Sequence, residues 1–316
     1  MTDDAEAYAG YSPRDVPVRV SGAVVGLSLL VALLAAIATA IGLLWQGEGR
    51  SYLYETLRGQ TAEIHGRGLY RYDTLFQGAG NTGTDLTSLL LGIPLLLASL
   101  TLYRRGSLRG GLLLLGALSY FLYVYASYAL NVAYNELFLL YVALFSASLW
   151  TLLLAFRSID PQVLGVHCSV HMPRRVPALF LLASGVVTLA IWLIEPVSSL
   201  IQHEPPQHLD TYTTLFTNAL DMAVIVPAVA CAGVLIWQRS PMGYLMALPL
   251  LVLEIFLAPM IGLQALQQVR SGVSFSTGEI MGPILGFGMF AVLAAVIVIH
   301  IMSNILEKLP ARRISR

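Results

Sequence analysis

DTLFQGAGNTGTDLTSLLLGIPLLLASLTLYRRGSLRGGL, residues 73 to 112, passes from a polar, glycine-rich segment into an apolar run and ends in a turn that contains arginines. A weaker echo, DTYTTLFTNALDMAVIVPAVACAGVLIWQRSPMGYL, spans residues 210 to 245. Both copies open with Asp-Thr, place another acid where the apolar run begins, and carry a proline inside that run. The matched pairs are Asp73 with Asp210, Asp85 with Asp221, and Pro94 with Pro227. We interpret the two stretches as one unit used twice in a multi-pass membrane protein.

The composition supports a membrane protein. Of the 316 residues, 57% are hydrophobic and only 11% are charged, whereas soluble domains carry about 25% charged residues. A charge in the hydrocarbon core costs roughly 2.5–3.5 kcal/mol on insertion scales, so lipid exposure explains the shortfall. The net charge is zero, which gives no reason to expect a nucleic-acid partner. Cys168 falls in a loop and Cys231 in a helix, so a structural disulfide between them is not expected.

Eight apolar runs are each long enough to cross a bilayer core about 30 Å thick. We therefore predict an all-α integral membrane protein with eight transmembrane helices. The predicted helices are about Val20–Trp45, Asp85–Tyr103, Gly110–Ala133, Glu136–Phe156, Val176–Val197, Thr214–Gln238, Gly243–Leu266 and Ile280–Ser303. A polar tail (1–19) precedes them, a long loop (46–84) follows the first helix, and a basic tail, KLPARRISR, closes the chain.

The distribution of basic residues predicts the orientation. An excess of Lys and Arg marks cytoplasmic segments. If both termini are cytoplasmic, the outer segments hold only five of the 18 basic residues, namely Arg50, Arg58, Arg67, Arg71 and Arg270. This bias predicts a cell (inner) membrane protein with both termini in the cytoplasm and the 46–84 loop outside.

Further landmarks extend the internal repeat. PRDVP (13–17) precedes the first helix and PRRVP (173–177) the fifth, and the turns after the second and sixth helices match at several positions. These positions are Ser107 with Ser240, Gly110 with Gly243, and Leu112 with Leu245, while Glu136 and Glu279 open the fourth and eighth helices. We predict two tandem, parallel four-helix halves, 1–157 and 158–316, and transporters often bind their substrate at such an interface. The alternative is that Pro, Arg and Gly recur at membrane boundaries for generic reasons.

Six acids are expected at or near the outer helix ends. They are Asp73, Asp85, Glu136, Asp210, Asp221 and Glu279. An acid at a helix N-terminus is favoured by the helix dipole and by free N–H groups, which is a purely structural explanation. Asp221 lies about two turns into its predicted helix, where an ionisable group should face the bundle interior or water. The functional alternative is a vestibule that binds a cation, a proton or a polar headgroup.

Two features inside the membrane are further candidates. The third helix carries Tyr120, Tyr123, Ser127, Asn131 and Tyr134 on one face. This polar stripe either forms hydrogen bonds between helices or lines a polar path. Glu254 lies near the middle of the seventh helix between two prolines, in LPLLVLEIFLAP. It is either a functional acid or a protonated one bonded to a neighbouring helix.

The outer segment HGRGLYRYDT, residues 65 to 74, alternates basic and aromatic residues. Arg67 and Arg71 either pair with the outer acids or hold a phosphate or carboxylate through bidentate bonds. The histidines near His203 and the HCxxH segment at 167–171 lack a complete ligand set, so neither a metal site nor a cofactor is expected. The chain contains no Walker loop, GxSxG, HExxH or CxxC motif.

Three classes of function remain open. The leading one is binding or translocation of a small solute, ion or proton through an outward-facing vestibule lined by acids, with Glu254 deeper in. The second is a membrane enzyme acting on a lipid-linked or phosphate-bearing substrate at the outer face, where a carboxylate serves as base. The third is an accessory or scaffold subunit. The expected partners are the lipid bilayer and a small solute, ion or lipid headgroup, and self-association into a homo-oligomer is left open.

Overall fold

The protein is a bundle of long helices in a computed structural model that describes residues 18–45 and 47–307. Eight helical segments of this part are long and apolar enough to cross a membrane, as predicted. They are α2 (Gly22–Leu44), α3 to α4 (Leu75–Arg104), α5 (Leu108–Leu130), α6 (Phe138–Arg157), α8 (Arg175–Gln202), α9 to α10 (Phe216–Trp237), α11 (Pro241–Arg270) and α12 (Thr277–Ser303). The PRDVP motif and the basic tail from residue 308 onward lie outside the described residues.

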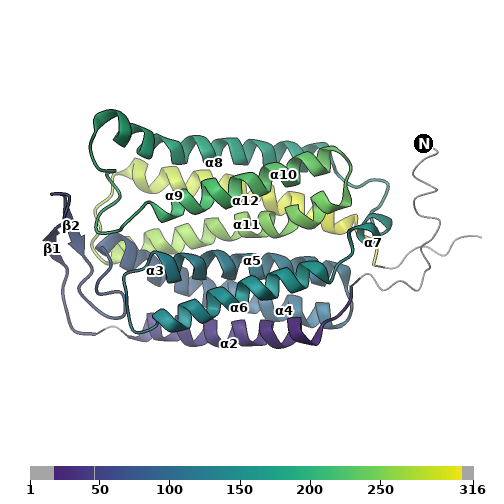
Figure 1. The fold of residues 1–316 in the computed structure, drawn as a ribbon, viewed down its shortest axis with the longest axis horizontal. Helices are drawn as coiled ribbons and strands as arrows, with labels where there is room; N and C mark the ends of the chain where they lie inside the picture. The colour runs from purple at the N-terminus through teal and green to yellow at the C-terminus, as the bar shows by residue number, and fades with distance from the viewer. Residues whose placement is uncertain (1–17, 46, 308–316) are drawn as a thin grey trace, which may run out of the picture.

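The helices run roughly along the long axis, and the two ends of the bundle differ (Figure 1). A hairpin of β1 (Tyr52–Glu55) and β2 (Thr61–Ile64), which the sequence analysis did not predict, lies at one end. We call this the hairpin end. The short helix α7 (Pro161–Val166) lies at the opposite end, which we call the α7 end.

The second membrane helix begins at Leu75, ten residues earlier than predicted. The side chain of Thr74 caps it by accepting a 3.2 Å hydrogen bond from the backbone N–H of Gln77. Glycine in a helix is unfavourable in water, but small residues let membrane helices approach closely. A Cβ at Gly83 would collide with the backbone of Gln264 in α11. The predicted loop therefore forms a helix because its polar, glycine-rich face packs on another helix.

Two membrane helices are interrupted at matching places. The π-helical segment η1 (Ser88–Gly92) separates α3 (Leu75–Thr87) from α4 (Ile93–Arg104), and η2 (Asp221–Ile225) separates α9 (Phe216–Leu220) from α10 (Val226–Trp237). In each case the first residue after the segment donates its N–H to a carbonyl five residues back, and a proline follows. Because proline lacks an N–H and disturbs the preceding turn, the wider turn accommodates Pro94 and Pro227.

Helices α5 and α11 form the centre of the bundle. Helix α5 packs against α4, α6 and α11, and α11 packs against α3, α5, α10 and α12. Figure 1 shows α2 to α6 on one side of the molecule and α8 to α12 on the other. The contacts of α11 with α3 and α5 join the two sides, so residues at this junction come from widely separated parts of the chain.

Candidate functional site

The first buried acid, Asp85, lies in α3 and is only 2% exposed. Its Oδ2 accepts a 2.6 Å hydrogen bond from the hydroxyl of Tyr70, and Oδ1 accepts a 3.3 Å bond from that of Tyr128. Gly42 of α2 makes room for the carboxyl group, because a Cβ there would collide with Oδ2. Asp85 is therefore enclosed rather than placed in an open vestibule, and its hydrogen-bond donors come from loop and helix.

Tyrosine rings surround Asp85. Tyr128 contacts Tyr70, Tyr125 and Tyr141 through ring centroid distances of 6.2, 5.8 and 5.1 Å. The hydroxyl groups of Tyr125 and Tyr141 are buried and have no hydrogen-bond partner among the described residues. Tyr125 and Tyr128 lie in α5 but are not part of the polar face that the sequence predicted there, so these tyrosines were missed. Their dense spacing in 120–128 was the available signal.

The second buried acid, Asp221, is the first residue of η2 and is 9% exposed. Its Oδ2 accepts a 2.9 Å hydrogen bond from the indole N–H of Trp192 in α8. The amide of Asn218 donates a 3.2 Å bond to the backbone carbonyl of Trp192 and so helps hold this residue. The hydroxyl of Tyr123, in α5, also faces Asp221. Neutral donors thus surround the carboxyl group.

Glu254, near the middle of α11, lies close enough to Asp221 and to Tyr123 for their charges to interact. Its side chain is partly buried and makes no hydrogen bond or ion pair within 18–45 and 47–307. Asp221, Glu254, Tyr123 and Trp192 therefore form a group contributed by η2, α11, α5 and α8, which we call the carboxyl pair site. The sequence analysis named the first three separately but did not predict that they meet, and it missed Trp192.

At the hairpin end, Asp73 is completely buried. Its Oδ1 accepts hydrogen bonds from the backbone N–H of Ala133 at 2.9 Å and from the hydroxyl of Tyr212 at 2.8 Å, while Oδ2 has no partner among the described residues. Burial raises the pKa of Asp73 to about 7, since desolvation outweighs these two bonds. Asp73 therefore connects the start of α3 with two distant loops.

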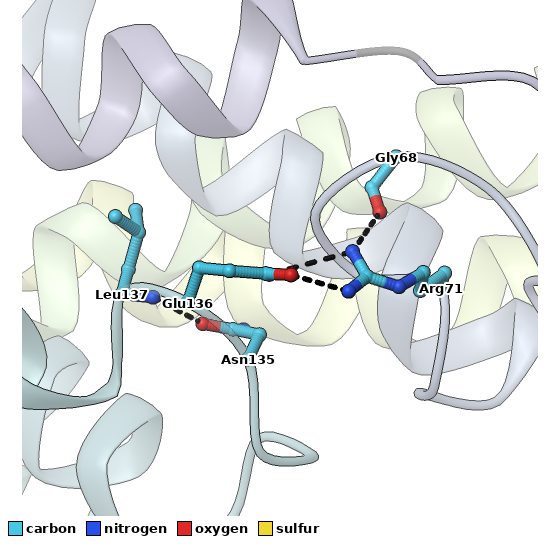
Figure 2. A network of polar contacts seen from close by, with 5 residues as sticks. All are labelled: Gly68, Arg71, Asn135, Glu136 and Leu137. Carbon is cyan, nitrogen blue, oxygen red and sulfur yellow. Dashed lines mark hydrogen bonds and ion pairs between the residues drawn. The ribbon is translucent and has the colours of Figure 1, made fainter.

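The other hairpin-end acids lie apart from one another. Glu136 forms a bidentate ion pair with Arg71, which also donates to the carbonyl of Gly68 (Figure 2). This bond with Arg71 lowers the pKa of Glu136. Asp210 is half-buried, which raises its pKa. Glu279 is exposed and completes a capping box with Ser276 at the start of α12. The six predicted acids thus occupy separate surroundings.

A cavity of about 230 Å³ lies at the hairpin end, between the C-terminal end of α2, the 65–70 loop, α3 and the end of α11. Its polar lining includes His65, Arg67, Arg270 and Ser271, and the guanidinium of Arg67 donates a 3.3 Å bond to Ser271. Burial lowers the pKa of His65, and the charge of Arg67 acts in the same direction. Arg71 pairs with Glu136, which is the first of the two alternatives that the sequence offered for it, and it does not line this cavity.

Asn131 immediately follows α5, and it is half-buried. No group of three or more His, Cys, Asp or Glu residues in the described ranges 18–45 and 47–307 has a geometry that could hold a metal ion. A search of protein-family models, curated proteins and solved structures found no match for the chain.

Proposed function

We propose that this membrane protein binds a proton or small cation at the carboxyl pair site and translocates it, alone or with a small solute. The observation that carries the proposal is the juxtaposition of Asp221 and Glu254 between four membrane helices. Ionisable groups inside a bilayer are costly and are functional candidates by default. Here two of them, from different helices, share one site.

The chemistry of the pair favours a positively charged ligand. Two nearby carboxylates repel strongly in a medium of low dielectric constant, so a proton or cation between them is stabilising. Trp192 and Tyr123 donate hydrogen bonds but carry no positive charge. Neither acid has a salt bridge to Lys or Arg within residues 18–45 and 47–307. A proton or a mobile cation is therefore the ligand that the charge of this site favours.

The surrounding backbone suits a site that changes its geometry. Asp221 begins a π-helical segment, which is common at functional sites in helices. Glu254 lies between Pro249 and Pro259 within α11. Prolines interrupt the regular helical hydrogen bonds and leave carbonyl groups available for other partners. We propose that these carbonyl groups assist the carboxyl pair in binding the ion.

We further propose that the hairpin end faces outward and both termini face the cytoplasm of a cell whose inner membrane holds the protein. The bias of basic residues toward the α7 end supports this orientation.

We also infer that residues 1–157 and 158–316 arose by duplication. In each half a π-helical segment is followed by a proline. The turn before the next helix contains a residue of positive φ, that helix has a serine at its N-cap, and a glycine follows three residues after the serine. Isolated antiparallel bridges join the segments that flank the four helices of each half, Val18 with Ile159 and Cys168 with Ile305. When the two halves are aligned on these features, Asp221 corresponds to Ser88 and Asp85 corresponds to Asn218. This alignment is shifted by three residues from the pairing of Asp85 with Asp221 that the sequence suggested.

The proposal can be tested in liposomes that contain the purified full chain. An internal pH-sensitive dye reports proton entry driven by a membrane potential, and radioactive Na⁺ and K⁺ report cation uptake. We expect Glu254→Gln and Asp221→Asn to reduce the flux at least about ten-fold, as loss of an essential charged partner does. Glu279→Gln is the matched control, because this exposed acid only caps α12. Unchanged flux in both carboxyl variants, or no flux of any of these ions in the wild type, contradicts the proposal.

The cavity at the hairpin end supports a second candidate, an enzyme or receptor for a phosphate-bearing or lipid-linked substrate. Arg67, Arg270 and His65 line it together with Leu43 and Trp45, so charged and apolar groups are both present. Arg67→Gln should weaken binding of a soluble phosphomonoester measured by calorimetry, and Arg58→Gln, on the nearby hairpin, should not. Equal binding by the wild type and Arg67→Gln would exclude this role for the cavity.

A further inference from the structure

A second, larger cavity lies at the α7 end and is rich in arginine. It has a volume of about 530 Å³. It lies where the segment after α7 meets the first turns of α8 and α11. Its lining residues that matter here are Arg174, Arg175, Arg239, Met172, Val170 and Tyr244. No acidic residue is among the residues that line it.

The three guanidinium groups are available for a ligand. Arg174, Arg175 and Arg239 make no ion pair and donate no side-chain hydrogen bond to any residue within 18–45 and 47–307. Arg174 is half-buried and its charge acts on the neighbouring hydroxyl of Tyr244. That hydroxyl donates a 2.9 Å hydrogen bond to the carbonyl of Pro173, which fixes one wall of the cavity.

Two helix N-termini add to the positive potential. Arg174 is the N-cap of α8, a helix of 28 residues, and Ser240 is the N-cap of α11, which has 30. Neither residue caps its helix through its side chain. Pro241 in α11 and Pro177 in α8 have no N–H group, so the first-turn N–H groups that can bind an anion are those of Met242 in α11 and of Arg175 and Val176 in α8. The helix dipole favours negative charge at both ends.

The proposed repeat offers a comparison for this site, although Pro241 stands where the other half has Leu108. Helix α5 begins at the position that corresponds to the start of α11, and its N-terminus is occupied by the carboxylate of Glu307. This carboxylate accepts hydrogen bonds from the hydroxyl of Ser107 at 2.8 Å and from the N–H groups of Leu108 and Arg109 at 3.2 and 3.0 Å. At α11, the helix α7 takes the place that the Glu307 segment has at α5. Helix α7 packs on α11 but supplies no acid to the cavity.

We propose that this cavity binds the phosphate group of an anionic membrane lipid. Arginine binds phosphate oxygens through paired N–H groups, and basic pockets at the cytoplasmic ends of membrane helices hold lipid headgroups. We assign the ligand to a lipid rather than a free anion because exposed apolar side chains lie close in sequence to the arginines. Val176 directly follows Arg175, and Trp237 lies two residues before Arg239. Their side chains are 65% and 53% exposed and offer contacts for acyl chains.

The experiment measures lipid binding to the detergent-solubilised full chain by native mass spectrometry. The probes are phosphatidylglycerol, phosphatidylcholine and inorganic phosphate. We expect phosphatidylglycerol to bind at least about ten-fold more tightly than phosphatidylcholine, because only the former carries a net charge for the arginines. Inorganic phosphate at the same concentration should not displace it.

Variants locate the lipid at the cavity. Arg174→Gln combined with Arg239→Gln should remove this preference. The matched control, Arg104→Gln with Arg105→Gln, removes the same charge from exposed positions at the same end of the bundle and should retain it. Equal loss in both double variants would mean general attraction to basic residues and would overturn the proposal. Displacement by inorganic phosphate would overturn the assignment to a lipid.

Ser240→Asp keeps the proposal testable if the arginine variants do not fold. The new carboxylate would imitate Glu307 at the equivalent helix N-terminus and should cap α11 without loss of thermal stability. Because it competes with the lipid phosphate, we expect weaker binding of phosphatidylglycerol. Unchanged binding in a folded Ser240→Asp protein contradicts the proposed position of the phosphate.

Discussion

The hydroxyl group of Tyr212 donates a 2.8 Å hydrogen bond to Oδ1 of Asp73, although the two residues are 139 positions apart. Further contacts connect the same regions. Arg58 and Gln60, in and beside the turn of the hairpin, donate to the backbone carbonyls of Tyr212 and Pro206 at 3.3 and 3.2 Å. The loop before α3 and the loop before α9 are thus hydrogen-bonded to each other at the hairpin end of the bundle.

Removing this bond should destabilise the protein. Tyr212→Phe leaves the buried carboxyl group of Asp73 with one donor fewer, and an unsatisfied buried group costs about 1–3 kcal/mol. We expect a lower unfolding temperature in detergent micelles, followed by circular dichroism. Tyr134→Phe is the control, because Tyr134 is 76% exposed at the same end and should lose nothing measurable. Identical unfolding temperatures of the two variants would show that the hydrogen bond makes no net contribution to stability.

Stability should also depend on pH through Asp73. Its pKa is raised from 3.8 to about 7, so the folded protein holds a proton that the unfolded chain releases as pH rises above 3.8. The contribution of Asp73 therefore falls between about pH 4 and pH 7 and is constant above that range. Asp73→Asn should flatten this part of the curve of unfolding temperature against pH. A wild-type slope that survives the substitution would assign the dependence to other groups.

Helix α2 offers a direct test of the packing around Asp85. An alanine at Gly42 would collide with Oδ2 of Asp85 and with the hydroxyl of Tyr70, whereas a Cβ at Gly26 in the same helix meets nothing within 4 Å. Overpacking a buried site costs about 1–3 kcal/mol. We expect Gly42→Ala to lower the unfolding temperature and Gly26→Ala to leave it unchanged or raise it. Equal effects would mean that the carboxyl group moves away freely.

The contact between α3 and α11 should be equally sensitive to an added methyl group. Gly83→Ala places a methyl group against the backbone of Gln264, which cannot move without shifting α11. Gly262→Ala adds the same methyl group to α11 where there is open space. We expect the first variant to lose stability in a chemical denaturation series and the second to match the wild type. A tolerant Gly83→Ala would show that these helices are not tightly held.

The ion pair between Arg71 and Glu136 should matter little for stability. Their side chains are 30% and 42% exposed, and exposed pairs contribute about 1 kcal/mol or less. We expect Glu136→Gln to change the unfolding temperature only slightly, and by less at high salt, where screening has already weakened the pair. A large, salt-independent loss would indicate an additional partner for Glu136.

Several features of the site were readable from sequence and others were not. Glu254 and Asp221 stood out because acids are rare in apolar helices. Their proximity could not be predicted, because it depends on how η2 packs beside α5 and α11. Tyr70 was read as part of an outer loop, yet its hydroxyl reaches into the bundle to Asp85. The segment 75–84 was assigned to a loop, because its glycines are poor helix formers outside a close helix contact.

The sequence by itself determined that eight segments of the described chain are long and apolar enough to cross a membrane as helices, since such stretches satisfy their backbone hydrogen bonds in lipid only in that form. Only the tertiary structure decided which acids share a site, which are enclosed and which pair with arginine at the surface. The physical reason is that hydrophobicity is a local property of a segment. The surroundings of a carboxyl group are instead set by side chains from helices that lie far away along the chain.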